Sequence, residues 1–314
     1  MSAPTTAAWP TPPKKRRMGD LLFAGATRTA ASIILVALAG VAIFLTVEGL
    51  PGLTAPPERM GGEATFLAYV WPLVFGTLLA AFIALLIATP LSIGVALVIS
   101  HYSPRRLAKP IGYLVDLLAA VPSVVYGLWG IAFVGPALVP VYRWLEENLG
   151  FLPFFSGPAS GTGRTILTAG IVLAIMALPI ITAICREIFA QTPTLHQEAA
   201  LALGATRFEM VRMAVIPYSK SGIVSAVMLG LGRALGETMA VALVLSATRI
   251  VTWDVIASTS PSTIAANIVL GFPEATGLGV NVLIATGLVL FVITFAVNFT
   301  ARLIVARSEK GLVR

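Results

Sequence analysis

The stretch KSGIVSAVMLGLGRALGETMAVALVL, from Lys220 to Leu245, decides how the rest of this sequence is interpreted. It is apolar over a length that crosses a bilayer, yet it carries Arg233 and Glu237 near its middle. A charged side chain at membrane depth costs at least a few kcal/mol, so it is seldom left facing lipid. Because the two residues are four apart, one helix would present both on the same face, with Arg233 on the order of 20 Å into the span.

The composition is that of a multi-pass membrane protein. Of the 314 residues, 57% are hydrophobic and 11% are charged, against about a quarter charged in soluble proteins. The net charge is +7, but the basic residues lie in short segments between apolar runs, so nucleic acid is not an expected partner. With one cysteine, Cys185, and two distant histidines, His101 and His196, the chain has no internal disulfide and no metal-ligand spacing.

Six apolar runs of roughly 20 or more residues predict six membrane spans in an all-α integral membrane fold. They fall at 29–47, 73–99, 111–139, 166–189, 223–245 and 280–304. Sixteen lysines and arginines lie on one side of these spans and four on the other, which predicts that both termini are cytoplasmic. The first run is too long for a signal peptide and is interpreted as a retained span, and the tail before it, 1–19, is expected to be disordered.

Two further segments contain candidate residues for a polar path through the membrane. The third span includes VPSVVYGLWG, residues 121–130, where Pro122 stands beside Ser123 and Tyr126. An ordinary kink explains the proline equally well, because Gly and Pro are common in membrane helices. Between the fifth and sixth spans, residues 261–277 predict a helix that ends near Gly271 and is too short to cross. Asn267 within it could line the path, although a packing role is the expected one.

The loop between the fourth and fifth spans, 191–220, contains sequence signals for the starts and ends of short helices. Thr194 with Gln197, and Thr206 with Glu209, have the spacing of capping boxes at helix starts. Between these two helices, Gly204 is expected to adopt the left-handed conformation that ends the first.

Pro217 is expected to end the second loop helix, so that two short helices meet at a fixed corner. The first helix carries small apolar residues, Ala199, Ala200 and Ala202, which suit docking into a groove on another protein. The alternative is an amphipathic segment that lies on the membrane surface.

Two sets of residues carry a resemblance to a known family. Glu198-Ala199-Ala200, followed by Gly204 and Ile216-Pro217, resembles the EAA motif of ABC importer permeases. Ala214 and Ile216 depart from the pattern, which prefers Ile and Leu there. The stretch GRALGETMAV, 232–241, with AAVPSVVYGLWG at 119–130 and IAANIVLGFPEATG at 264–277, is similar to the permease subunit of the phosphate-specific ABC importer. The resemblance covers about residues 66–307.

This resemblance implies a six-helix, type I importer transmembrane domain over 20–314, in the cytoplasmic membrane. It implies that Glu198, Ala199, Ala200, Gly204 and Pro217 couple the chain to an ATPase. The expected partners besides the lipid bilayer are a homologous second permease subunit, an ATPase dimer and an extracytoplasmic phosphate-binding protein. No cofactor is expected on this chain, because ATP and Mg²⁺ would bind the ATPase.

The function expected from these residues is inward transport of inorganic phosphate by alternating access. Arg233 would pair with the oxyanion through its planar fork of donors. Glu237 would balance that charge and accept a hydrogen bond from a protonated phosphate, so that sulfate is repelled, with Ser123 and Tyr126 also on the path. An Arg–Glu pair that only joins helices, or an ion-coupled secondary anion transporter with an Arg–Glu proton relay, remains an alternative. The chain has no GxxxxGK[ST] motif and is expected to be non-catalytic.

Overall fold

The computed structural model describes residues 18–312, which divide into two compact units. The first ends at Phe44 and consists of the larger part of helix α1 (Met18–Leu53), whose described side chains there are almost all exposed. The second begins at Leu45 and holds all remaining elements. Of the predicted disordered tail, 1–19, residues 1–17 lie outside the described residues. The last two residues of that prediction belong to α1, which begins at Met18.

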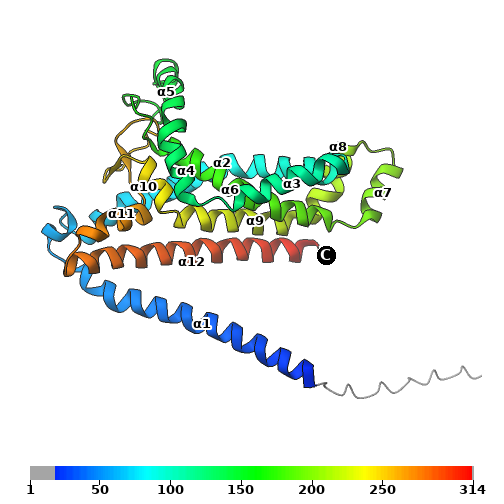
Figure 1. Cartoon of the computed structure of the whole chain (residues 1–314), viewed down its shortest axis with the longest axis horizontal. Coiled ribbons are helices and arrows are strands. Elements are labelled where there is room, and N and C mark those ends of the chain that lie inside the picture. Colours follow the sequence, from blue (N-terminus) through cyan, green and yellow to red (C-terminus); the bar gives the residue numbers. More distant parts are fainter. Residues whose placement is uncertain (1–17, 313–314) are drawn as a thin grey trace, which may run out of the picture. The chain divides into compact units, whose positions relative to one another are not determined.

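The second unit is built almost entirely from helices (Figure 1). Its α-helices are α2 (Phe66–Leu97), α3 (Arg105–Ala119), α4 (Ser123–Trp129), α5 (Gly135–Leu149), α6 (Ile166–Ala190), α7 (Thr194–Ala202), α8 (Arg207–Met210), α9 (Ile216–Gly236), α10 (Met239–Val244), α11 (Ile264–Gly271) and α12 (Leu278–Leu312). Tighter 3-10 turns lie at Pro57–Met60 and Phe272–Glu274, and wider π turns at Val98–Tyr102, Gly130–Val134 and Val211–Val215. Two short strands, β1 (Ala247–Thr248) and β2 (Ser260–Pro261), pair in parallel.

The core of this unit is the packing of α2 and α9 against α6 (Figure 1). Small residues allow the helices to approach closely, as expected where lipid offers no hydrophobic drive for association. On α9, a Cβ added to Gly222 would lie 2.6 Å from Ile188 Cδ1, and one on Gly230 would lie 2.6 Å from Ile181 Cδ1. Ala226 and Ala234, which alternate with these glycines at a spacing of four residues, are buried. One face of α9 is therefore fixed on α6.

Buried hydroxyl groups tie the helices together at defined points. Ser92 of α2 donates to the Leu178 carbonyl of α6 over 3.1 Å. Tyr142 of α5 and Thr168 of α6 share a hydrogen bond of 2.7 Å. Thr77 of α2 accepts from the backbone N–H of Ile264 over 3.0 Å, which holds the start of α11 against α2. Such bonds satisfy polar groups that the hydrocarbon layer cannot.

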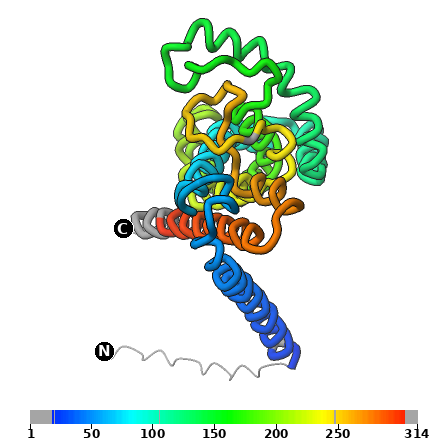
Figure 2. Tube along the Cα trace, turned by 90° about the vertical axis from the view of Figure 1, so that its left-hand side faces the viewer, coloured from blue at the N-terminus to red at the C-terminus, as the bar shows by residue number. Residues whose placement is uncertain are grey.

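The described residues contain six helical segments that are long and apolar enough to cross a membrane, as the sequence predicts. The second, fourth and sixth predicted spans correspond closely to α2, α6 and α12, and α11 is the short helix expected before α12. The third prediction, 111–139, is wrong as one helix. The chain turns at Ala120–Pro122, continues through α4, and α5 then points away from the bundle (Figures 1 and 2). The cytoplasmic placement of both termini stays a prediction.

Close contact between α2 and β2 provides a test of the packing. A Cβ at Gly76 would collide with the Ser262 carbonyl oxygen, whereas one at Gly94 on the same helix would meet nothing within 4 Å. We expect Gly76→Ala to lower the free energy of unfolding by about 1–3 kcal/mol, because backbone must move to make room. Gly94→Ala is the matched control and should be neutral or stabilising, since Ala favours the helix. Thermal unfolding of the purified chain in detergent measures both, and equal midpoints would contradict the expectation.

Candidate functional site

The fifth span breaks between its two charged residues. Helix α9 ends at Gly236, Glu237 has an extended backbone (φ −70°, ψ 126°), and α10 begins at Met239. The predicted continuous helix to Leu245 is therefore wrong, and so is the shared helical face of Arg233 and Glu237. The physical reason is that the Glu237 side chain bonds the backbone: its Oε1 accepts from the Ala240 N–H over 3.0 Å and caps α10.

Arg233 and Glu237 are also not an ion pair. Within 18–312, the ion pair that the structure forms is Arg186 with Asp116, at 3.3 Å between α6 and α3. Glu237 is 9% exposed and serves the backbone. The geometry that an Arg–Glu proton relay or a simple Arg–Glu staple requires is thus missing.

Arg233 lies in the last turn of α9, where a cation interacts favourably with the helix dipole. Its side chain is half-buried, and its Nε is buried with no hydrogen-bond partner among the described residues. The neighbouring Gly232 and Gly236 leave open space beside it. The Tyr126 hydroxyl on α4 donates to the Leu118 carbonyl over 2.8 Å. Of the predicted path residues, Arg233 thus has a buried donor without a described partner, whereas Tyr126 is buried and bonded to the backbone.

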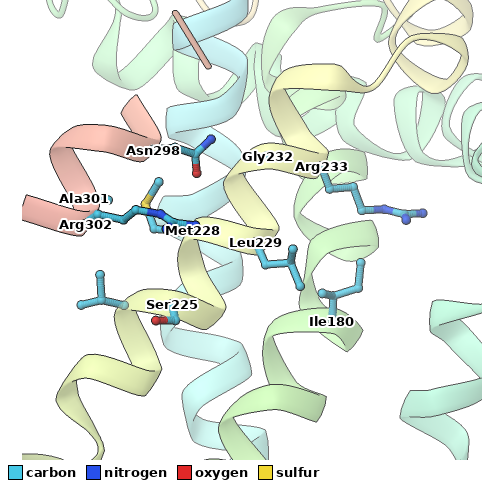
Figure 3. A pocket seen from close by; sticks show the side chains of 10 residues that line it. Ile180, Ser225, Met228, Leu229, Gly232, Arg233, Asn298, Ala301 and Arg302 are labelled. Carbon is cyan, nitrogen blue, oxygen red and sulfur yellow. The ribbon is translucent and has the colours of Figure 1, made fainter. Parts of the chain in front are cut away.

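A cavity of about 760 Å³ opens along the face of α9 that α6 leaves uncovered (Figure 3). Its walls come from α6, α9 and α12, and its lining residues are Ile180, Val224, Ser225, Met228, Leu229, Gly232, Arg233, Asn298, Ala301 and Arg302. These include two arginines and no carboxylate, so the lining is cationic. Ser225, Leu229 and Arg233 follow the helical spacing of four that the sequence shows, whereas Asn298 and Arg302 lie on another helix and have no local signal.

Ser123 and Asn267 do not line this cavity. Ser123 is half-exposed at the start of α4. The Asn267 amide donates to the Tyr69 hydroxyl over 2.9 Å and lies beside Arg249 in separate cavities of about 420 and 260 Å³. Arg249 itself donates to the Met60 carbonyl over 3.3 Å and lies over the Tyr69 ring. The expected packing role of Asn267 agrees with these contacts.

The segment after the break is held by α4. A Cβ at Gly127 would lie 2.8 Å from Ala240 Cα and 2.9 Å from Leu243 Cδ1, so the two short helices touch through their backbones. The AAVPSVVYGLWG and GRALGETMAV stretches, far apart in the sequence, are therefore packed together next to Arg233.

The loop at 191–220 forms the expected corner with one capping box instead of two. Gly204 is left-handed (φ +86°), and Thr206 with Glu209 forms the reciprocal box, with the Thr206 N–H to Glu209 Oε2 bond at 2.8 Å. The box predicted at Thr194 is absent, because α7 starts one residue after Pro193 and Gln197 donates to the Thr192 carbonyl over 3.1 Å.

The prediction that Pro217 ends the second loop helix is wrong. The chain stays helical from Arg207 to Gly236, through α8, the π turn at Val211–Val215 and α9. Pro217 stands in the first turn of α9, just after the π turn. Because that wider turn changes the hydrogen-bond register, the missing N–H of proline leaves no gap in the α9 ladder. The corner and Arg233 are therefore joined by one helical rod.

The outward face of the loop differs in detail from the prediction. Glu198, Ala199 and Ala202 are exposed as expected, but Ala200 is only 9% exposed and packs into the core. The large apolar side chains Leu195, Leu203 and Phe208 are exposed instead, by 73%, 88% and 65%. We call Leu195, Glu198, Ala199, Leu203 and Phe208 the loop surface.

Known proteins are similar to this chain in sequence and in fold. The family described as "Binding-protein-dependent transport system inner membrane component" matches residues 88–310. "Phosphate transport system permease protein PstC 2" of Mycobacterium tuberculosis is 46% identical over 307 residues, 94% of each chain. "Phosphate transport system permease protein PstC" of Mesorhizobium japonicum is 39% identical over 92% of this chain and 91% of its own length.

Two solved structures share the fold at low identity. A bacterial ABC transporter involved in the import of the acidic polysaccharide alginate aligns with a TM-score of 0.54 and 20% identity, covering 92% of this chain and 96% of its own. An inward-facing MetNI methionine ABC transporter aligns with a TM-score of 0.52 and 18% identity, covering 76% of this chain and 94% of its own. With the family match over most of the sequence, these findings show that the chain belongs to the inner membrane components of binding-protein-dependent transport systems.

Proposed function

We propose that this chain is a permease subunit of an ATP-driven importer that carries inorganic phosphate across the cytoplasmic membrane by alternating access. The relatives named as phosphate permeases match it along almost their full length. The observation that carries the proposal is Arg233: a cation within an apolar span, with a buried Nε that has no described partner, at the wall of a cationic cavity. Such a residue is a functional-site hypothesis by default.

Arginine suits this role chemically. Its guanidinium stays charged at any accessible pH and donates parallel hydrogen bonds to two oxygens of a phosphate. Beside an apolar wall the attraction is stronger than in bulk solvent. Glu237 has a different task from the one its sequence position suggests. Through Ala240 it fixes the end of α9, and so it sets where Arg233 stands. Glu237 does not line the cavity in this structure, so the proposal that its second oxygen accepts the proton of a hydrogen phosphate, which sulfate lacks, requires another conformation of the transport cycle.

The energy source and the remaining path belong to proposed partners. The sequence carries no phosphate loop, so ATP and Mg²⁺ are assigned to an ATPase dimer that docks on the loop surface. A homologous second permease subunit would close the open side of the cavity, and an extracytoplasmic binding protein would deliver phosphate. The rod from Arg207 to Gly236 links the ATPase contact to Arg233 mechanically, which supports the assignment.

Arg233→Gln tests the anion site. We expect ATP-dependent phosphate uptake by the assembled importer to fall at least about tenfold, because one charge-assisted pair of hydrogen bonds is worth roughly 1.5–3 kcal/mol. Arg233→Lys keeps the charge but loses the fork, and should retain part of the activity. Arg143→Gln, an exposed arginine on α5, is the control for loss of charge alone. Uptake of labelled phosphate competed by sulfate and arsenate is the measurement. Intact uptake and selectivity in Arg233→Gln would refute the assignment.

Leu203→Asp tests the loop surface. Leu203 is 88% exposed, so the change should leave the thermal stability of the chain within about 0.5 kcal/mol. A carboxylate buried in an apolar interface is costly, and we therefore expect loss of the ATPase from the purified assembly and loss of uptake. Leu203→Met preserves size and apolarity and should keep both. Wild-type recovery of the ATPase with Leu203→Asp would show that the ATPase docks elsewhere.

A further inference from the structure

The cavity beside α9 contains a second cation whose position the proposed function does not explain. Arg302 belongs to α12, and its side chain extends from α12 toward α9, ending beside Met228 (Figure 3). Arg233 lies on the opposite flank of α9 in the same picture. Helix α12 runs past α9 toward the end where α8 lies (Figure 1), so Arg302, late in α12, lines the cavity nearer to α8 than Arg233 does. The two guanidinium groups thus line one cavity at different levels.

The Arg302 side chain is exposed, and it extends toward α9 (Figure 3). An arginine near the end of a last span ordinarily extends its side chain outward to the polar headgroups. Arg302 instead helps to wall a cavity of about 760 Å³ whose lining residues include no Asp or Glu. A cavity whose charged lining residues are all cationic attracts an anion.

The uncharged polar residues of the cavity complement a protonated oxyanion. The Asn298 amide nitrogen donates to the Thr294 carbonyl over 2.9 Å, and the Ser225 hydroxyl donates to the Ser221 carbonyl over 2.9 Å. Asn298 keeps its Oδ1 acceptor and a second N–H, and Ser225 keeps its lone pairs as acceptors on the cavity wall. Acceptors beside cations suit a ligand that has both negative oxygens and an O–H group, as hydrogen phosphate does.

We propose that Arg302, with Asn298 and Ser225, forms a second phosphate station that receives the anion from Arg233 on its way to the cytoplasm. The inference rests on the proposed function and assigns the release side of the same cavity. A single tight cationic site would hold phosphate too long, whereas two weaker sites in sequence allow it to leave. Arg302 binds the released phosphate and does not select it.

Inhibition of import by phosphate inside the vesicle tests this station. The complete importer is reconstituted with its cytoplasmic side inward, ATP and graded phosphate are enclosed, and uptake of labelled phosphate from the binding protein is measured. We expect Arg302→Gln to raise the internal phosphate concentration for half-inhibition about tenfold, with Arg302→Lys in between. Arg106→Gln, an exposed arginine on α3 outside the cavity, should match the wild type. An unchanged half-inhibiting concentration in Arg302→Gln would overturn the inference.

A second measurement remains informative if Arg302→Gln impairs assembly. Ser225→Cys places a thiol on the cavity wall, and the native Cys185 is buried, so background labelling is low once the partner subunits are free of cysteine. Internal phosphate should slow modification by an anionic thiol reagent severalfold, and Arg302→Lys should weaken that protection. Labelling that phosphate does not slow would refute the station. A wild-type importer that moves no phosphate would instead refute the proposed function, so the two failures are distinguishable.

Discussion

The hydrogen bond from the Ala240 N–H to the Glu237 carboxylate determines how the chain runs where the two charged residues of the fifth span lie. The N–H groups in the first turn of α10 have no carbonyl within the helix to bond. The Glu237 carboxylate accepts from one of them, and this makes a helix break stable in an apolar setting. The break frees the last turn of α9 to present Arg233 to a cavity, while α10 turns to pack on Gly127. A continuous helix would have placed both charges on one face and favoured their neutralisation by each other.

The opposite side of α9 supplies rigidity. Gly222, Ala226, Gly230 and Ala234 lie against α6 with no room for added atoms at the glycines, so the helix cannot rotate without breaking that packing. A close-packed interior responds to force by moving whole elements, since it is not continuously deformable. Arg233 is therefore carried by α9 as a body, and the cavity changes shape only when α9 moves relative to α12 or to a neighbouring subunit.

Much of this could be predicted from the sequence, and the failures have a common cause. Long apolar runs predicted α2, α6 and α12 because helix length and composition are local properties, and Gly204 and the Thr206–Glu209 box follow from nearest neighbours along the chain. The prediction of a continuous helix through Glu237 failed because the Glu237 side chain accepts from a backbone N–H. The pattern of apolar residues carries no information about such a bond. The prediction that Pro217 ends the second loop helix failed because a π turn absorbs its missing donor.

The candidate site shows the same division. Arg233 is conspicuous in any apolar run, and its stripe with Ser225 and Leu229 follows from the helical period. Arg302 and Asn298 enter the site only because α12 packs beside α9, a contact between residues about seventy positions apart. The burial of Ala200 likewise depends on the core beneath α7, formed by Met210 and Val211, and not on the alanine-rich pattern itself.

The unbroken helical run from Arg207 to Gly236 gives the protein a lever. Arg233 lies sixteen residues beyond Pro217, about 24 Å along the axis. A tilt of the helix by roughly 5° about Pro217 displaces Arg233 by about 2 Å, which exceeds the range of about 0.5 Å over which an N–H···O hydrogen bond stays favourable. In the proposed importer, small angular motion at the corner formed by the 191–220 loop would thereby be amplified into an all-or-none change of the contacts that Arg233 makes with the anion. The stiffness of a single helix, and not any flexible joint, would then set how closely events at the loop and at Arg233 follow each other in the proposed importer.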